Sequence, residues 1–243
     1  LLKCPKGKAA GPNGLKPYLL HRAPREVKLA LYNALKETWN NDMVPKEFSE
    51  YDSFLIWKQK GSVEDVANYR PIALANAEYK IFAKILLGHL KKQIGRKFDK
   101  RQFGAIPNSS ALEAVFVLRQ SRSDIISQEK HPYLLSFDVS KAFDSTDWEV
   151  IPQALRHFGC EEWLVQKIME MVQKQEGRAF TRNGRSPVFR PKRGLRQGCP
   201  LSPILFSAVM SYVLHQVRTE DPEVCVSFVD DIKAVVGSLE RAN

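Results

Sequence analysis

Cysteine is scarce in this chain, and the few cysteines that it has lie far apart in the sequence. The 243 residues include four of them, Cys4, Cys160, Cys199 and Cys225. This number and spacing exclude a disulfide-stapled scaffold and a four-cysteine zinc site. The five histidines have no metal-ligand spacing, and no Ser/His or Cys/His pair indicates a protein nucleophile; they are His21, His89, His131, His157 and His215.

Long hydrophobic runs are missing as well. No apolar stretch reaches the roughly 18 residues of a membrane-spanning helix, and no signal-peptide pattern opens the chain. Hydrophobic residues make up 44% of the sequence and charged residues 26%, which is typical of a globular protein and unlike a disordered one. We therefore expect a globular, intracellular domain without a membrane partner. The chain begins with Leu1, so we also expect it to be a piece of something longer.

Acidic residues are under-represented in the first part of the chain. Residues 1–107 hold 20 Lys and Arg against 10 Asp and Glu, whereas residues 108–243 hold 17 of each, and the whole chain has a net charge of +10. Residues 177–196 form a second basic stretch without any acid. Such asymmetry predicts a polyanion-binding surface. No basic amphipathic helix with an aromatic face stands out, so nucleic acid is favoured over an anionic membrane.

The hydrophobic periodicity predicts a mixture of helices and strands. Helices are expected over residues 24–39, 75–94, 109–127, 148–158, 162–174 and 200–218. Strands are expected over residues 53–57, 133–138, 224–229 and 232–236. A hairpin is expected over residues 179–190, because its Asn183-Gly184 pair suits a tight turn. The order lacks a regular strand–helix–strand alternation, so the predicted fold class is α+β.

Three aspartates stand at the ends of apolar strands. Asp138 ends one of them, and Asp230 and Asp231 separate the last two. An exposed acidic turn is one interpretation of the adjacent pair. The other is that the strands lie side by side, so that their carboxylates form a cluster that Mg²⁺ neutralises. Two such ions about 4 Å apart serve in-line phosphoryl transfer, a chemistry that nucleases and polymerases share.

Seven motifs in a fixed order resemble one family of polymerases. The first four are Gly11-Pro-Asn-Gly, Phe54-Leu-Ile-Trp-Lys-Gln-Lys-Gly, Asn68-Tyr-Arg-Pro-Ile-Ala-Leu and Gln102-Phe-Gly-Ala-Ile-Pro. The other three are Phe137-Asp-Val-Ser-Lys-Ala-Phe-Asp, Gly194-Leu-Arg-Gln-Gly-Cys-Pro-Leu-Ser-Pro and Phe228-Val-Asp-Asp. Over nearly its whole length, the chain resembles the reverse transcriptase domain of non-LTR (LINE-type) retrotransposons. It departs from that pattern at Trp57, where many relatives have Pro, and at Val229, where many have Ala.

The resemblance implies a two-metal site and a selector of the sugar. By it, the carboxylates of Asp138, Asp230 and Asp231, with the backbone of Val139, bind two Mg²⁺ ions, for which Mn²⁺ can substitute. Phe143 stands where the family places a bulky side chain under the incoming sugar. A ring there excludes a ribose 2′-OH by overlap and so selects dNTPs.

The resemblance also implies residues that bind the nucleotide and the nucleic acid. Lys58, Arg70 and Gln197 are expected at the dNTP. The guanidinium of Arg70 is suited to phosphate oxygens because its planar fork can bond two of them at once. The expected contacts to template and primer come from one loop and comprise Gly198, Arg196, Arg193 and Lys192.

The expected architecture is that of a right-hand polymerase. The resemblance implies an α+β fold with an antiparallel palm sheet backed by helices. Fingers are expected over residues 1–107, palm over 108–144, a fingers return segment over 145–198, and palm with the catalytic hairpin over 199–243. The chain ends 12 residues after Asp231, so we expect the thumb to be absent from it.

The predicted function is that of an RNA-directed DNA polymerase. It would join dNTPs to a primer 3′-OH on an RNA template, and its expected location is the nucleus. Two alternatives stay open at this point: a non-catalytic, nucleic-acid-binding remnant of a retroelement, and an RNA-dependent RNA polymerase. Phe143 argues against the second, because RNA synthesis needs a polar group that accommodates the 2′-OH.

Overall fold

The computed structural model describes residues 7–41, 44–95, 97–106, 108–128, 130–181, 184–216 and 224–238. Its Cα atoms form two compact units. Unit 1 comprises Leu1–Gly88 and Glu162–Ser202, and unit 2 comprises His89–Glu161 and Pro203–Asn243. These boundaries differ from those of the expected segments, since residues 145–161 fall in unit 2. The assignment of segments to fingers and palm therefore stays a prediction.

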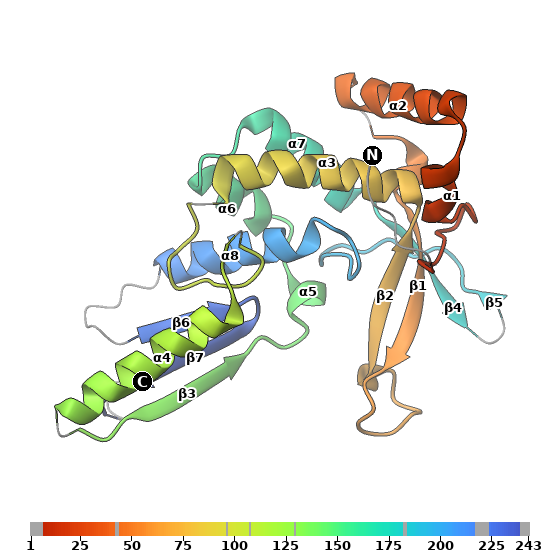
Figure 1. Cartoon of the computed structure of the whole chain (residues 1–243). Coiled ribbons are helices and arrows are strands. Elements are labelled where there is room, and N and C mark those ends of the chain that lie inside the picture. The colour runs from red at the N-terminus through yellow and green to blue at the C-terminus, as the bar shows by residue number, and fades with distance from the viewer. Residues whose placement is uncertain are drawn as a thin grey trace. The chain divides into compact units, whose positions relative to one another are not determined.

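Unit 1 contains a sheet in which the strand order is β2-β1-β4-β5. Strands β1 (Glu50–Trp57) and β2 (Tyr69–Ala75) form a long antiparallel hairpin, in register from Tyr51 opposite Ala75 to Trp57 opposite Tyr69 (Figure 1). Strand β4 (Glu176–Thr181) runs parallel to β1 on its other side. The two-residue strand β5 (Gly184–Arg185) pairs with β4.

Strand β2 is an element that the sequence pattern does not predict. It contains Pro71, which cannot donate to a strand ladder and is therefore confined to edge strands and bulges. In the described sheet β2 is an edge strand, with β1 as its neighbour. The proline is thus compatible with the strand. The helix expected from residue 75 begins two residues later, as α3 (Ala77–Ile94).

Helices and aromatic side chains complete unit 1. The indole of Trp39 contacts the rings of Phe82 and Trp163 edge-on, with centroid distances of 6.3 and 5.2 Å. Phe82 and Leu86 are fully buried, and each such side chain contributes about 1.5–3 kcal/mol to stability. The further elements are α1 (Pro17–Arg22), α2 (Arg25–Asn40), the 3₁₀ helices η1 (Lys46–Phe48) and η2 (Val66–Asn68), and α7 (Glu162–Gln173).

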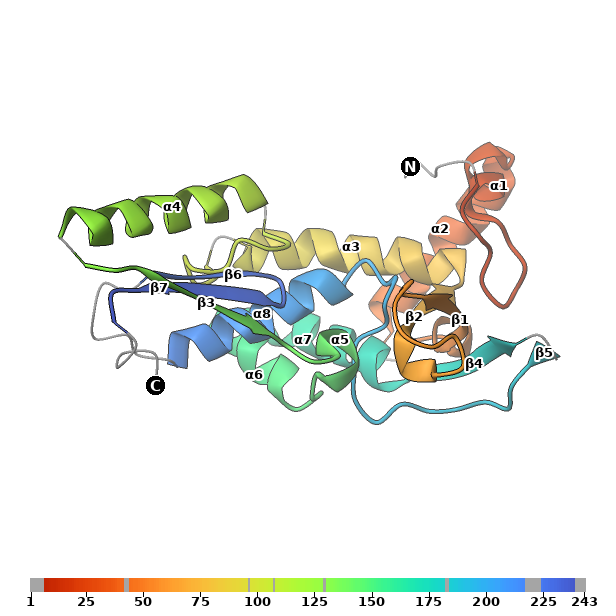
Figure 2. The same ribbon diagram turned by 90° about the horizontal axis from the view of Figure 1, so that it is seen from below.

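Unit 2 is built on an antiparallel sheet with the order β3-β7-β6. Its strands are β3 (Tyr133–Asp138), β6 (Val224–Phe228) and β7 (Asp231–Val236). Helix α4 (Ala111–Ser127) lies over one face of this sheet, and α8 (Ser202–Gln216), whose residues from Pro203 onward belong to unit 2, lies over the other (Figure 2). A capping box formed by Ser110 and Glu113 begins α4, because each residue satisfies a backbone N–H of the other.

Two short helices precede the return of the chain to unit 1. These are α5 (Ala142–Ser145) and α6 (Val150–His157). The predicted helices and strands of unit 2 are confirmed to within two residues at each described end. The expected turn residue Asn183, with Arg182, lies outside the described residues, as do residues 217 and 218 of the expected last helix. Within the described parts, no helix is long and apolar enough to cross a membrane.

Candidate functional site

The turn between β6 and β7 carries two of the three predicted aspartates. Val229 and Asp230 form the turn, and β7 begins at Asp231, opposite Phe228. The sequence predicts this turn one residue later, at the Asp230–Asp231 pair. The shift places Val229, a β-branched residue, in the left-handed region at φ 61°. Asp231 is therefore a strand residue with a defined partner on the neighbouring strand.

That partner is Asp138, at the end of β3. Asp138 and Asp231 are directly opposite in the antiparallel ladder. Opposite residues point to the same face of a sheet, with Cβ atoms about 4.5–5.5 Å apart. Both residues are exposed, and Asp230 is half-buried. The Lys233 ammonium donates to Asp231 Oδ1 and to Ser136 Oγ, each at 2.9 Å, so a cation already balances part of this acidic edge.

The donor set at this edge fits a hard divalent cation in its chemistry. Mg²⁺ takes a small number of carboxylates and completes its shell with water and phosphate oxygens. Asp138 and Asp231 share a face, and Asp230 is adjacent to Asp231 in the turn. Among the described residues, however, no three His, Cys, Asp or Glu side chains converge into a ready-made metal cage. A bound ion would therefore compete with Lys233 for Asp231.

Phe143 belongs to the same unit and lies in α5, shortly after Asp138. Its ring stacks on that of Phe206 of α8, with 5.2 Å between centroids and 25° between planes. Phe143 is half-buried, so one side of the ring is held by α8 and part of the side chain faces solvent. Val139 follows Asp138 directly and is also half-buried. The two predicted residues thus belong to the same short stretch of chain as Asp138.

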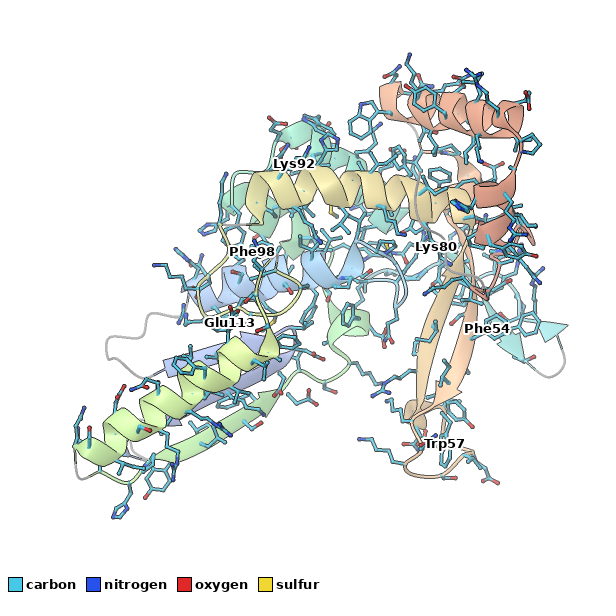
Figure 3. All side chains as sticks on the ribbon, in the orientation of Figure 1. Phe54, Trp57, Lys80, Lys92, Phe98 and Glu113 are labelled. Carbon is cyan, nitrogen blue, oxygen red and sulfur yellow. The ribbon has the colours of Figure 1, made fainter. Side chains whose placement is uncertain are left out.

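The predicted nucleotide-binding residues belong to unit 1. Lys58 follows β1, and its ammonium donates to the Ala67 carbonyl at 2.8 Å. Arg70 is an exposed residue of β2, opposite Ile56 of β1. Both lie toward the loop end of the hairpin, where Figure 3 labels Trp57. The structure therefore brings Lys58 and Arg70 together at one end of the β1–β2 hairpin.

The Gln197–Gly198 loop contacts the same hairpin. The backbone N–H of Ala73 in β2 donates to the Gln197 carbonyl at 2.7 Å. Gly198 has φ 110°, and a Cβ atom there would lie 2.9 Å from the Ala73 carbonyl oxygen. Glycine is thus required at this position both by the backbone conformation and by the close approach. Arg70 and the contact of Gln197 thus belong to one strand, β2, and their expected role at the dNTP stays a prediction.

Arg196 is not where a residue in contact with nucleic acid is expected. Its side chain is buried, and its guanidinium lies between the rings of Tyr51 and Tyr79, 5.0 and 4.6 Å from their centroids. It donates to Gln175 Oε1 and to two backbone carbonyls, at 3.0 to 3.1 Å. The guanidinium is thus occupied within unit 1. The expected template or primer contact of Arg196 is therefore withdrawn, because a charge so enclosed is not available to a phosphate.

Tyr79 completes this buried cluster. Its hydroxyl is 2.9 Å from Cys199 Sγ. Burial, with a smaller contribution from Cys199, holds the pKa of Tyr79 well above its usual value. The phenol is therefore neutral at every physiological pH.

Lys192 and Arg193 differ from Arg196 in exposure. Both are exposed residues of the segment that leads from β5 to α8. Two other basic residues of the stretch 177–196 have acidic partners: Arg185 bonds to Asp52 and Arg190 to Glu176, each at 2.7 Å. Lys192 and Arg193 are accordingly the residues of this loop that we retain as candidates for contact with nucleic acid.

One cavity of unit 1 does not coincide with these residues. It has a volume of about 1100 Å³ and is bordered by α2, η1 and the end of α7. Its lining includes Thr38, Phe48 and Arg190 but none of the predicted site residues. Nothing in its mixed lining indicates one class of ligand.

Gln102 is a residue to which sequence reasoning assigned no role. It is buried in unit 2, and its side-chain amide bonds to the backbone of the turn before Asp230. The sequence signal was present, since Gln102 opens one of the seven motifs. A polar residue inside a motif gives no indication of its partner, however, and the partner here is more than 100 residues away in sequence.

Comparisons with known proteins show what the chain is similar to. Residues 57–243 match the sequence model of the family described as "Reverse transcriptase (RNA-dependent DNA polymerase)". The chain is 30% identical over 216 residues to the "Retrovirus-related Pol polyprotein from type-1 retrotransposable element R2" of Nasonia vitripennis, covering 87% of this chain and 20% of that protein. It is 27% identical over 201 residues to the "Transposon TX1 uncharacterized 149 kDa protein" of Xenopus laevis, covering 76% and 15%. The chain thus spans a fifth or less of these relatives.

Solved structures show the same fold. Apo telomerase from Candida tropicalis, truncated from its C-terminal domain, matches with a TM-score of 0.60 at 15% identity, over 88% of this chain and 50% of that one. Telomerase from the same organism, in complex with a fragment of telomeric RNA, matches with a TM-score of 0.62 at 13% identity, over 87% and 40%. The expected α+β fold of a right-hand polymerase is thereby confirmed.

Proposed function

Because the chain belongs to the reverse transcriptase family, we propose that it carries the polymerase core of a non-LTR retrotransposon enzyme. In this proposal it transfers dNTPs to the 3′-OH of a DNA primer, directed by an RNA template. The matched family and the R2 relatives support the reaction class. The chain spans only 20% of the R2 protein of Nasonia vitripennis, so the activity of a whole protein is proposed rather than established.

The observation that carries the proposal is the pairing of Asp138 with Asp231. The β3–β7 register places these carboxylates on one face of the sheet, with Asp230 in the adjoining turn. Nucleotidyl transfer requires that negative charge be neutralised where the primer oxygen and the pyrophosphate oxygens meet. An edge with two exposed carboxylates and a third, half-buried one in the adjoining turn is suited to bind the cations for this purpose.

The proposed residue roles in unit 2 follow from that edge. Asp138, Asp230 and Asp231, with the carbonyl of Val139, would hold Mg²⁺ or Mn²⁺. When bound, such ions neutralise phosphate charge and stabilise the attacking and leaving oxygens. The protein itself supplies positioning, since the described site contains no side chain suited to nucleophilic attack.

Phe143 is proposed to set the choice of sugar. Its ring is held against Phe206 and therefore resists displacement. A ribose 2′-OH that overlaps a fixed ring would have to move either the sugar or the ring. The deoxyribose lacks this hydroxyl and fits. We therefore assign the preference for dNTPs over NTPs to Phe143.

Residues of unit 1 are proposed to bind phosphates. Arg70 and Lys58 are assigned to the triphosphate, together with Gln197, whose backbone carbonyl accepts from Ala73 of β2. Lys192, Arg193 and the backbone at Gly198 are assigned to template and primer. The favoured partners are accordingly RNA template, DNA primer and dNTPs. A nuclear location belongs to the same proposal, since it is where an element of this class meets its target DNA.

A primer-extension assay tests the proposal directly. The longest native polypeptide that contains residues 1–243 is incubated with an RNA template, a DNA primer, dNTPs and Mg²⁺. We expect extension by the parent protein and its loss in Asp138→Asn and Asp230→Asn. Asp147→Asn, an exposed aspartate of the same unit, is the matched control and should extend normally. Phe143→Val should admit NTPs, because it removes the ring.

Two outcomes would contradict the proposal and favour the alternatives. Binding of the template–primer duplex without any extension would support a non-catalytic remnant. Extension with NTPs alone would support an RNA-dependent RNA polymerase. Unchanged sugar selection in Phe143→Val would remove only the assignment of Phe143.

A further inference from the structure

Val229, in the turn before Asp230, holds an unusual backbone conformation for its residue type. Its φ of 61° is in the left-handed region, which β-branched residues disfavour because their side chain crowds the backbone. Such a conformation persists only where the surroundings stabilise it. Val229 directly precedes Asp230 and follows the last residue of β6, so its conformation sets the direction in which Asp230 and Asp231 leave the turn.

The stabilising group is the side-chain amide of Gln102. Gln102 Oε1 accepts from the Val229 N–H at 3.0 Å and from the Gly104 N–H at 2.7 Å. Gln102 Nε2 donates to Ser227 Oγ at 3.0 Å and lies 3.4 Å from the Val229 carbonyl. One buried amide thus contacts both polar groups of the strained residue. Ser227 Oγ also donates to the Val229 carbonyl at 3.2 Å.

Gln102 is itself fixed by the backbone on either side of it. The Ser227 N–H donates to the Arg101 carbonyl, and the Phe103 N–H donates to the Ser227 carbonyl, both at 2.7 Å. The segment around Gln102 therefore runs beside β6 as a short parallel bridge. Gly104 allows the close approach, because a Cβ atom there would lie 2.2 Å from the Val229 nitrogen.

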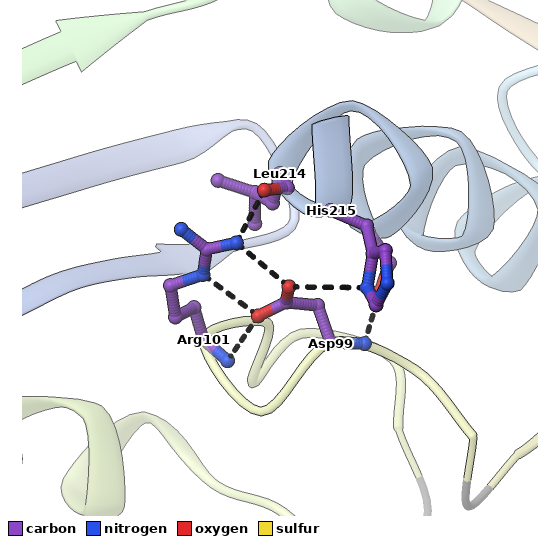
Figure 4. A network of polar contacts seen from close by, with 5 residues as sticks. Asp99, Arg101, Leu214 and His215 are labelled. Carbon is purple, nitrogen blue, oxygen red and sulfur yellow. Dashed lines mark hydrogen bonds and ion pairs between the residues drawn. The ribbon is translucent and has the colours of Figure 1, made fainter. Parts of the chain in front are cut away.

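A second anchor lies one residue before Gln102. Arg101 donates to both carboxylate oxygens of Asp99, at 2.8 Å, and to the carbonyl of Leu214 near the end of α8 (Figure 4). Burial works to raise the pKa of Asp99, but the hydrogen bonds from Arg101 outweigh it and lower that pKa. The pair is therefore charged at neutral pH, and it holds the segment before Gln102 to α8.

We propose that Gln102 is a positioning residue for the catalytic turn. The hydrogen bonds of its amide offset the energetic cost of the left-handed conformation of Val229. They thereby keep Asp231 in register with Asp138, and they keep Asp230 beside Asp231. This inference rests on the proposed function of the three aspartates. It goes beyond that function because Gln102, which is not one of the three aspartates, would influence the rate of the chemical step.

The test compares Gln102→Met, Val229→Gly and the double variant in the longest native polypeptide that contains the chain. Gln102→Met keeps the side-chain length and removes the hydrogen bonds. We expect it to lower kcat by about 10²-fold, the loss that a displacement of roughly 1 Å produces at a reacting centre. The Kd for template–primer should stay within twofold, because the residue is buried away from any ligand.

Val229→Gly provides the rescue that a merely structural role would not show. Glycine adopts the left-handed region without crowding and needs no compensation there. The double variant should therefore recover most of the kcat that Gln102→Met loses. Gln102→Glu keeps the acceptor for the Val229 N–H, so its kcat should lie between that of the parent and that of Gln102→Met. Gln93→Met, which removes two hydrogen bonds with Glu161 in the same unit, is the matched control and should keep kcat within twofold.

Amide hydrogen exchange gives a readout that does not depend on activity. Gln102→Met should increase exchange at Val229 while leaving β3 and α4 protected. A kcat within twofold of the parent in Gln102→Met, or no rescue in the double variant, would overturn the inference even if the protein extends primers. If the parent extends no primer, the proposed function fails, and unchanged exchange at Val229 in Gln102→Met would still refute the positioning role by itself.

Discussion

The two units of the chain differ in net charge and in where their charged residues lie. Unit 1 has 23 Lys and Arg against 12 Asp and Glu, a net charge of +11, whereas unit 2 has 14 against 15, a net charge of −1. The excess positive charge of the whole chain therefore belongs to unit 1. Unit 2 instead gathers carboxylates at one exposed edge of its sheet. A single net charge for the chain conceals this difference between a basic unit, to which we assign phosphate binding, and a nearly neutral unit, to which we assign cation binding.

The units also differ in how they place their functional residues. In unit 1, a buried arginine between two tyrosine rings holds the segments that lead to the Gln197–Gly198 loop. In unit 2, a buried neutral amide holds the turn that carries Asp230. Both are fully enclosed polar groups whose partners are mostly backbone atoms. Substitution of either buried group should therefore cost more stability or activity than substitution of an exposed charged residue.

The largest expected effect is on the stability of unit 1. Arg196→Ala removes the hydrogen bonds that the guanidinium donates to Gln175 and to the carbonyls of Phe48 and Ser49, and it opens a cavity between two rings. We expect a loss of about 2–4 kcal/mol in the free energy of unfolding. Arg193→Ala, an exposed arginine of the same loop, should change it by less than about 0.5 kcal/mol. Chemical denaturation measures both, and equal effects of the two variants would contradict the structural assignment of Arg196.

A smaller effect is expected on the binding of nucleic acid. Replacing Lys192 and Arg193 together by Ala should weaken template–primer binding and reduce the slope of log K against log salt by about 2, one for each phosphate contact. The matched pair Arg119 and Arg122, exposed on α4 of unit 2, should leave the slope unchanged when replaced by Ala. Anisotropy titrations between low and moderate salt measure the slope. If replacing the α4 pair reduced the slope equally, the assignment of nucleic-acid contacts to unit 1 rather than to unit 2 would be wrong.

The smallest effect is expected at the acidic edge of unit 2. Lys233→Met removes the ammonium that donates to Asp231. Exposed ion pairs of this kind contribute about 0–1 kcal/mol, so the Mg²⁺ concentration for half-maximal extension should fall by up to about fivefold. Titration of extension rate against Mg²⁺ checks this. An increased requirement for Mg²⁺ would show instead that Lys233 assists the cation or the nucleotide.

Much of unit 2 could be predicted from the sequence, because its strands end at charged residues. The apolar run before Asp138 and the runs on either side of the Asp230–Asp231 pair indicated the strands, and the expected cluster follows from their adjacency. The position of the turn could not be predicted. Local preference disfavours a left-handed valine, and the hydrogen bonds that oppose that preference come mainly from the buried amide of Gln102, which is distant in sequence.

Unit 1 was harder to predict, for two physical reasons. The sequence pattern predicted no strand over β2, and only the edge position of β2 makes its Pro71 compatible with the sheet. Arg196 was assigned to nucleic acid from the family resemblance, which places its loop at the template and primer. Its burial depends on two tyrosines and on backbone carbonyls that no sequence pattern brings together.

One measurement tests the separation of binding from chemistry most directly. Single-turnover primer extension and template–primer Kd are determined on the same preparation of Asp231→Asn and of the parent protein. We predict that the variant binds as tightly as the parent, or more tightly through the loss of a negative charge, and that it extends no primer. Extension at the parental rate would contradict the account, and so would a loss of binding that matches the loss of extension.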